Sequence, residues 1–278
     1  MLRFLAAAAL SVLSVLAPLT AARAQSVAPI DTLYRALGLP EIVEIMREEG
    51  LGHGADMRAD LLGGAGGARW DALVSAIYDA DRMADTLRSR MDIVLAAEDL
   101  APMIAFFTSD LGQEIIALEV SARRAFLEPD IEQASKDAVA RMAADQDARL
   151  TLIEALTDKA DLIDSNVVGA LNSNFAFYTG LAEGGGLPGA LTEEEILADV
   201  WSQEPDIRSD TTEWLLSYLT LAYAPLSDAE LNAYIAFFET DAGVALNEAI
   251  FAAFDEMFVD ISRALGQAAA GFMVGEEL

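Results

Sequence analysis

The sequence of 278 residues contains no cysteine and a single histidine, His53. Without cysteine the chain has no disulfide, no thiol nucleophile and no sulfur ligand for a metal. One histidine leaves too few ligands for most zinc sites. A Ser-His-Asp triad would have to use His53, and no G-x-S-x-G turn accompanies it. We therefore predict no catalytic, metal-binding or cofactor-binding residue, and we expect His53 to be an exposed loop residue.

Basic residues are also scarce, with 17 Lys and Arg against 46 Asp and Glu, so the formal net charge is −29. Such a surface repels phosphates, which disfavours binding to nucleic acid and to anionic lipid. The acids follow no calcium-loop pattern such as D-x-[DN]-x-[DN]-G, and we interpret them as solvated helix faces. We expect the one adjacent basic pair, Arg123-Arg124, to form salt bridges rather than an anion site.

Long apolar runs are missing beyond the first residues. The uncharged run from Phe4 to Leu19 is shorter than the roughly 20 residues that a membrane-spanning helix needs. Arg3 precedes this run, and Ala22-Arg23-Ala24 supplies a small-x-small pattern, which together are typical of a secretory signal peptide. We expect residues 1–24 to be a signal peptide cleaved after Ala24. The mature protein is then periplasmic or secreted, without a stable membrane anchor.

No stretch alternates apolar and polar residues long enough to indicate a strand, and the apolar spacing is helical instead. Apolar residues in steps of three and four predict helices over Trp70–Ala97 and Leu246–Leu265. Asp130–Tyr178 has no proline and one glycine, which predicts a long helix broken near Thr157-Asp158. The predicted fold class is all-α.

Glycine, proline and capping residues mark the expected helix ends. Gly38-Leu39-Pro40 ends one helix and starts the next. Gly50–Gly54, Gly63–Gly67 and Glu183–Gly189 are expected to be loops, and Gly63–Gly67 lacks the Lys-Ser or Lys-Thr of a phosphate loop. Capping boxes are predicted at the helix starts that follow Thr192 and Ser227.

A segment of fifteen residues occurs twice. Glu98–Gly112 and Ala229–Gly243 align without a gap at an offset of 131 residues, and seven of the fifteen positions are identical. Trp70 and Trp201 share that offset. Duplication explains this agreement better than coincidence. We predict two tandem homologous helical-bundle modules, residues 25–145 and 146–278, the second with a short C-terminal tail. The boundary is expected near Met142–Arg149, inside a continuous helix that joins the modules.

Each copy of the segment reads as the end of one helix, a tight turn and the start of another helix. Serine or threonine suits the N-cap of the second helix, and glycine in its first turn lets the two helices approach closely. These residues form the predicted structural turn motif: Phe106, Phe107, Ser109, Gly112, Phe237, Phe238, Thr240 and Gly243.

The turn motif resembles a family of exported bacterial helical proteins, DUF2059, whose members carry an F-[FY]-x-S-x-x-G-Q type of segment between two helices. The first copy matches this pattern through Ser109 and Gln113, whereas the second has Thr240 and Val244 at those positions. Both copies have Asp where the family often has Pro. The resemblance implies an all-helical, exported protein in two tandem copies, without assigned chemistry or catalytic residues to carry over.

The aromatic residues leave two interpretations open. They either pack in the core or line a cavity for an apolar ligand, and the Phe251-Phe254-Phe258 spacing also suits a helix face that contacts a partner. The set comprises Phe106, Phe107, Phe175, Phe177, Tyr178, Phe237, Phe238, Phe251, Phe254 and Phe258.

Three hypotheses of function follow from the sequence. The first is a periplasmic, non-enzymatic binding module that holds an apolar ligand or another envelope protein. The second is a carboxylate-dependent hydrolase acting on envelope material, which only the abundance of acids supports. The third is a structural or envelope-stress protein whose surface charge matters more than a pocket. We favour the first, and the sequence leaves the oligomeric state open.

Overall fold

The computed structural model describes residues 28–187 and 192–275, and all regular secondary structure within these ranges is α-helical. The all-α prediction is confirmed there. The predicted signal peptide lies outside the described residues. Among the helices that are described, none combines the length and the apolar character that crossing a membrane requires.

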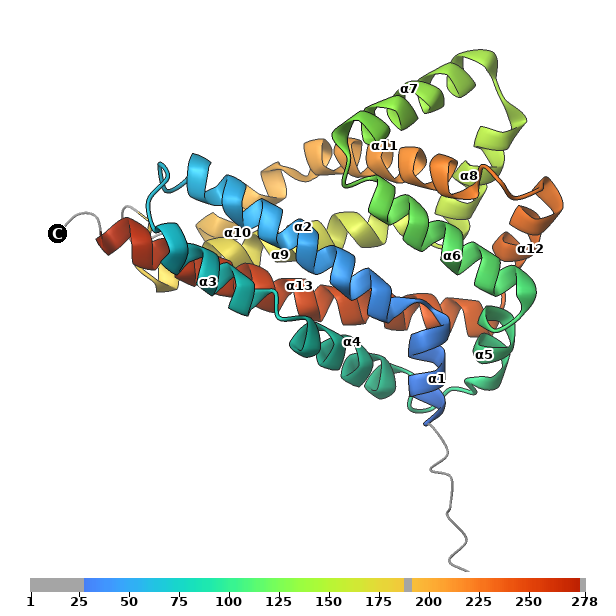
Figure 1. The fold of residues 1–278 in the computed structure, drawn as a ribbon, viewed down its shortest axis with the longest axis horizontal. Coiled ribbons are helices and arrows are strands. Elements are labelled where there is room, and N and C mark those ends of the chain that lie inside the picture. Colours follow the sequence, from blue (N-terminus) through green and yellow to red (C-terminus); the bar gives the residue numbers. More distant parts are fainter. Residues whose placement is uncertain (1–27, 188–191, 276–278) are drawn as a thin grey trace, which may run out of the picture.

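The described chain forms helices α1 to α13, which Figure 1 labels in order. The first half contains α1 (Pro29–Ala36), α2 (Leu39–Asp60), α3 (Gly67–Ile77), α4 (Ala80–Val94), α5 (Ala101–Phe107) and α6 (Asp110–Ala125). Helix α7 (Pro129–Asp145) follows. The second half contains α8 (Ala148–Lys159), α9 (Leu162–Glu183), α10 (Glu193–Ser202), α11 (Glu204–Tyr223), α12 (Asp228–Phe238) and α13 (Asp241–Gly275).

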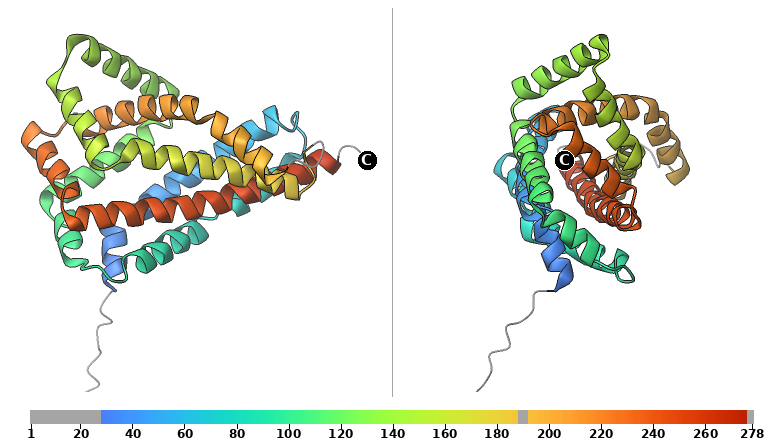
Figure 2. Two further views of the ribbon diagram at one scale, coloured as in Figure 1. Left: turned by 180° about the vertical axis from the view of Figure 1, so that it is seen from behind. Right: turned by 90° about the vertical axis from the view of Figure 1, so that its right-hand side faces the viewer.

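The longest helix, α13, lies in the middle of the molecule, with its most extensive packing against α9 and then against α4. In Figure 1 the helices spread from a narrow end, at α3 and the end of α13, toward a broad end at α5 and α12. The end-on view of Figure 2 shows the blue-to-green helices of the first half on one side of α13 and the yellow-to-orange helices on the other. The last helix of the second half therefore holds both halves together.

One large hydrophobic core joins the two halves. It contains Trp70, Leu87 and Ile115 from the first half and Leu231 and Leu246 from the second, and none of these side chains has measurable exposure. A smaller cluster lies between α9 and α10. The arrangement as two tandem modules stays a prediction, and the shared core shows that the halves bury their apolar faces against each other.

The expected continuous helix between the halves is wrong. Helix α7 ends at Asp145, Gln146 adopts a left-handed conformation with φ 53°, and Asp147 caps α8 by accepting a hydrogen bond from the amide of Arg149. The short polar Asp147 offers the backbone a cap, and caps compete with helix continuation.

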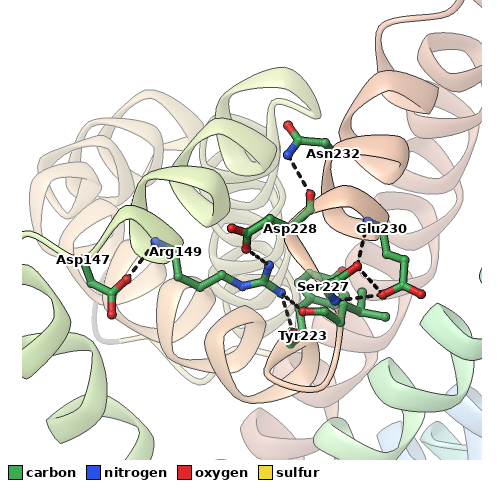
Figure 3. Close-up of polar contacts among 8 residues, drawn as sticks. Asp147, Arg149, Tyr223, Ser227, Asp228, Glu230 and Asn232 are labelled. Carbon is green, nitrogen blue, oxygen red and sulfur yellow. Dashed lines mark hydrogen bonds and ion pairs between the residues drawn. The ribbon is translucent and has the colours of Figure 1, made fainter.

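Arg149 then fixes the start of α8 to the turn between α11 and α12 (Figure 3). Its guanidinium donates to the carbonyl oxygens of Tyr223 at 2.7 Å and Leu226 at 2.8 Å, and it pairs with the Asp228 carboxylate at 2.7 Å. A cation on the last carbonyls of a helix is favoured by the helix dipole.

The helix predicted over Trp70–Ala97 is two helices. It breaks at Tyr78-Asp79, where the Asp79 carboxylate accepts from the Arg82 amide at 2.9 Å and caps α4. The periodic apolar pattern continues across the break because both helices face the same core. The predicted break near Thr157-Asp158 is confirmed within a few residues, at Ala160-Asp161 between α8 and α9.

The prediction of a loop at Gly50–Gly54 is wrong, whereas the loop at Gly63–Gly67 is confirmed up to Gly66. Gly50 and Gly54 lie on the buried face of α2, where a Cβ would overlap the ring of Tyr78 and the side chain of Val74. Close approach of α3, rather than chain flexibility, explains these glycines. His53, between them, is exposed as expected but lies on a helix.

The predicted helix starts are confirmed. Pro40 lies in the first turn of α2, and Thr192 and Ser227 each form a complete capping box, at α10 and α12.

The two tryptophans that are 131 residues apart differ in their surroundings. Trp70 is fully buried and donates from Nε1 to the carbonyl oxygen of Gly54 at 2.7 Å, whereas Trp201 is 60% exposed.

The helix contact at Gly54 makes a testable prediction. Gly54→Ala places a methyl group against Val74 and should lower the free energy of unfolding by about 1–3 kcal/mol. Gly52→Ala is the matched control, because no described atom lies within 4 Å of a Cβ at Gly52. We expect it to raise the stability by about 0.5–1 kcal/mol through helix propensity. Urea denaturation measures both, and equal effects at the two positions would contradict the close-packing explanation.

Candidate functional site

The two copies of the turn motif adopt the same local hydrogen bonds. The Ser109 hydroxyl donates to the carbonyl oxygen of Phe106 at 2.6 Å and accepts from the Gly112 amide at 3.1 Å. The Thr240 hydroxyl donates to the carbonyl of Phe237 at 2.7 Å and accepts from the Gly243 amide at 3.0 Å. The predicted N-caps are therefore present at the starts of both α6 and α13.

The two motif glycines also share one environment. A Cβ at Gly112 would overlap the carbonyl oxygen of Phe106, and a Cβ at Gly243 would overlap that of Phe237. Each glycine thus lets a helix fold back directly against the end of the preceding one, as the sequence predicted.

The motifs meet each other in the folded chain. The rings of Phe106 and Phe237 stack with centroids 4.3 Å apart, and Phe107 lies edge-on to Phe237 at 5.3 Å. Tyr234 of α12 stacks on Phe106 at 6.0 Å. Aromatic pairs in such geometries contribute about 0.5–1.5 kcal/mol each beyond their buried area. The turn-motif residues therefore form one aromatic cluster between the halves.

A cavity of about 550 Å³ opens beside this aromatic cluster, between the two halves. Its wall comes from α2, α5 and α6 of the first half and from α9, α11, α12 and α13 of the second. Phe107 and Phe238 of the turn motif reach the cavity. The volume falls within the range of roughly 300–1,000 Å³ that small-molecule sites occupy.

The predicted aromatic set supports both interpretations. Five of its members line the cavity, namely Phe107, Phe238, Phe251, Phe254 and Phe258. All of these except Phe251 also belong to the main hydrophobic core or pack against it. The remaining five pack on the hydrophobic clusters only, and they are Phe106, Phe175, Phe177, Tyr178 and Phe237.

The α13 side of the cavity is mainly apolar, with Asp255 as its charged residue, whereas α6 contributes both a carboxylate and a guanidinium. Ile250, Phe254 and Phe258 lie one helical turn apart along α13. Across from them, α6 presents Glu119 and Arg123, also one turn apart. Glu119 and Ile250 each lie ten residues after the N-cap of their helix. Equivalent positions of the two turn motifs therefore carry a charged residue in α6 and an apolar residue in α13.

Three tyrosines surround Glu119. The hydroxyls of Tyr223 and Tyr234 both donate to its Oε1, at 2.6 Å and 3.0 Å, and the hydroxyl of Tyr218 donates to its backbone carbonyl at 2.9 Å. No hydrogen bond from the described residues reaches Glu119 Oε2. The side chain is partly buried, and it lines the cavity.

Burial dominates the electrostatics of this carboxyl. Desolvation raises the pKa of Glu119 above its ordinary value, and the hydrogen bonds from Tyr223 and Tyr234 offset only part of that rise. Desolvation and the nearby Glu119 carboxylate raise the pKa values of the Tyr218, Tyr223 and Tyr234 hydroxyls well above normal, so the tyrosines remain donors.

Arg123 is already occupied by protein groups. Its guanidinium donates to both carboxylate oxygens of Glu49, at 2.8 Å and 2.6 Å, and lies over the ring of Trp214 at 5.0 Å. Trp214 in turn stacks on Tyr218 with centroids 5.1 Å apart. The salt bridge predicted for the basic pair is confirmed at Arg123, which holds α2, α6 and α11 together.

Glu119 is absent from the sequence-based predictions, which offered the cavity as one of two interpretations of the aromatic residues. An acid at one position in an acidic amphipathic helix carries no distinguishing signal. The one available signal was the repeat itself, which aligns Glu119 with Ile250 at the 131-residue offset.

Among the described residues, no group of three or more His, Asp or Glu side chains is placed to hold a metal ion.

Comparison with known families agrees with the resemblance. A family model described as an uncharacterized protein conserved in bacteria (DUF2059) matches residues 81–141. This segment includes α5, α6 and nearly all of α4 and α7, with the first turn motif and Glu119. The predicted resemblance is confirmed over these residues, and the second copy lies outside the match. Neither the curated proteins nor the solved structures gave a match to the chain.

The raised pKa of Glu119 predicts a pH-dependent stability. A carboxyl whose pKa is higher in the folded chain stabilises the fold most below its unfolded value of about 4.3. That contribution is lost as the pH rises through the folded pKa. Relative to Glu119→Gln, the wild-type protein should therefore lose stability as the pH increases from 5 toward neutral. The loss should fall between the unfolded pKa and the raised pKa of Glu119 in the folded chain.

Urea denaturation of both proteins at a series of pH values checks this. Glu114→Gln, on the exposed face of the same helix, is the matched control for a change in net charge. Parallel stability curves for the wild-type protein and Glu119→Gln would contradict the burial of the Glu119 carboxyl.

Proposed function

We propose that this protein is an exported, non-enzymatic binding module that holds a small apolar ligand in the cavity between its halves. The observation that carries the proposal is the cavity itself, with about 550 Å³ of space and walls of aromatic and aliphatic side chains. Ligand sites are typically concave, mostly apolar and equipped with a few polar groups that orient the ligand. Export is supported by the signal-peptide pattern that ends at Ala24.

The composition of the walls supports an apolar occupant. Leu39, Ile42 and Met46 of α2 face the cavity from one half, and the phenylalanines of α13 face it from the other. An apolar ligand that covers these side chains removes apolar surface from water, which contributes about 25 cal/mol per Å². A flat partner surface would leave the interior of such a cavity unfilled, so we place a small molecule ahead of an envelope protein as the occupant.

A substitution that fills the cavity tests the proposal. Gly169 of α9 lines the cavity, and no described atom lies within 4 Å of a Cβ built there. Gly169→Leu should therefore fold normally and occupy ligand space. We expect the wild-type protein to bind the neutral fluorescent probe phenylnaphthylamine with a rise in emission, and Gly169→Leu to weaken that binding on the order of tenfold or more, since lost apolar contacts raise Kd.

The matched control places the same side chain elsewhere. Gly271 of α13 is exposed and also has no described atom within 4 Å of a Cβ, so Gly271→Leu adds an equal apolar group outside the cavity. It should bind the probe as the wild-type protein does. Absence of probe binding by the wild-type protein, or equal binding by Gly169→Leu, would overturn the proposal.

A further inference from the structure

The charges on the cavity wall do not balance. The described lining contains two carboxylates, Glu119 and Asp255, and one guanidinium, Arg123. Arg123 is already bound on both nitrogens that face Glu49, so it does not neutralise the cavity acids. Asp255 accepts a hydrogen bond from the Asn172 amide at 2.9 Å. Glu119 receives only neutral hydroxyl donors, and both of those reach the same oxygen.

The free oxygen of Glu119 has the surroundings of a cation site. Oε2 accepts no hydrogen bond from the described residues and belongs to a side chain that lines the cavity. Tyr218 and Tyr234, which both donate to Glu119, also line the cavity, and aromatic rings attract positively charged nitrogen. An ammonium group has three donors and no acceptor, so it matches a carboxylate oxygen that lacks a donor.

From this arrangement we propose that the ligand is a cationic amphiphile, with one positively charged amine at Glu119 and an apolar tail along Phe254 and Phe258. The inference rests on the proposed function, because it names the class of ligand for the same cavity. An anionic amphiphile is disfavoured, because its head group would meet two carboxylates and an arginine that is already paired. A neutral head group, such as a hydroxyl, can donate to Oε2 but leaves the negative charge of the carboxylate unbalanced. Binding of the cation displaces any proton on Glu119.

The cavity also extends toward a second source of negative charge. A smaller hollow of about 180 Å³ shares Ser165, Phe238 and Phe251 with the main cavity and is lined further by Asp161 and Glu248. Lys159 lies on the same rim and pairs with Glu239 at 2.7 Å. The overall charge of −29 adds long-range attraction for a cation approaching from solvent.

The test compares three molecules of equal chain length as competitors for bound phenylnaphthylamine. Decylamine is cationic at pH 8, decanol is neutral and decanoate is anionic. We expect decylamine to displace the probe from the wild-type protein at a concentration on the order of tenfold lower than decanol, since a desolvated ion pair with aromatic support favours the cation by such a factor. Decanoate should compete least. Circular dichroism at each concentration ensures that the fold is retained.

Variants assign this preference to a residue. Glu119→Gln keeps the one oxygen that accepts from both Tyr223 and Tyr234, replaces Oε2 with an amide nitrogen and removes the charge, so it should lose the preference for decylamine over decanol. Asp255→Asn and the exposed Glu114→Gln should retain most of that preference. A preference that persists in Glu119→Gln, or that only Asp255→Asn abolishes, would overturn the assignment to Glu119.

The outcomes separate the two proposals. Probe binding without any preference among the three competitors, or with a preference for decanoate, would overturn the cationic ligand and leave the binding module standing. Failure of the wild-type protein to bind the probe or any of the three molecules would overturn the binding module, and the cationic ligand with it.

Discussion

The stack of Phe106 on Phe237 lies at the centre of the aromatic cluster through which the two turn motifs bring the halves of the chain together. Each ring is held at the end of a helix that a serine or threonine cap and a glycine turn bring against the next helix. Helices α6 and α13 both start at this contact, and both line the cavity. The same turn that packs the halves thus sets where the cavity opens.

The polarity of the cavity lining depends on a difference between α6 and α13 at positions equally distant from their N-caps. At the tenth residue after the cap, α6 has Glu119 and α13 has Ile250. The α6 side is therefore polar and joined to tyrosine hydroxyls, whereas the α13 side is apolar except for Asp255. Such a contrast suits a ligand with two chemically different ends. The hydrolase hypothesis of the sequence stays a hypothesis.

Local features of the fold were predictable from sequence, whereas features set by neighbouring helices were not. Capping at Thr192 and Ser227 and the turns at Ser109 and Thr240 depend on residues a few positions apart. The helical Gly50 and Gly54 have the composition of a loop, and only the approach of Tyr78 and Val74 explains them. The breaks at Asp79 and Gln146 interrupt continuous apolar patterns. The cavity depends on seven helices at once, so no single stretch of sequence indicates it.

A crystal structure of the protein soaked with decylamine tests the central claim most directly. We expect continuous density inside the cavity, with the amine within hydrogen-bonding distance of a Glu119 carboxylate oxygen, about 2.7–2.9 Å, and the chain along the phenylalanines of α13. A cavity filled by its own side chains, or decylamine bound only on the outer surface, would contradict it.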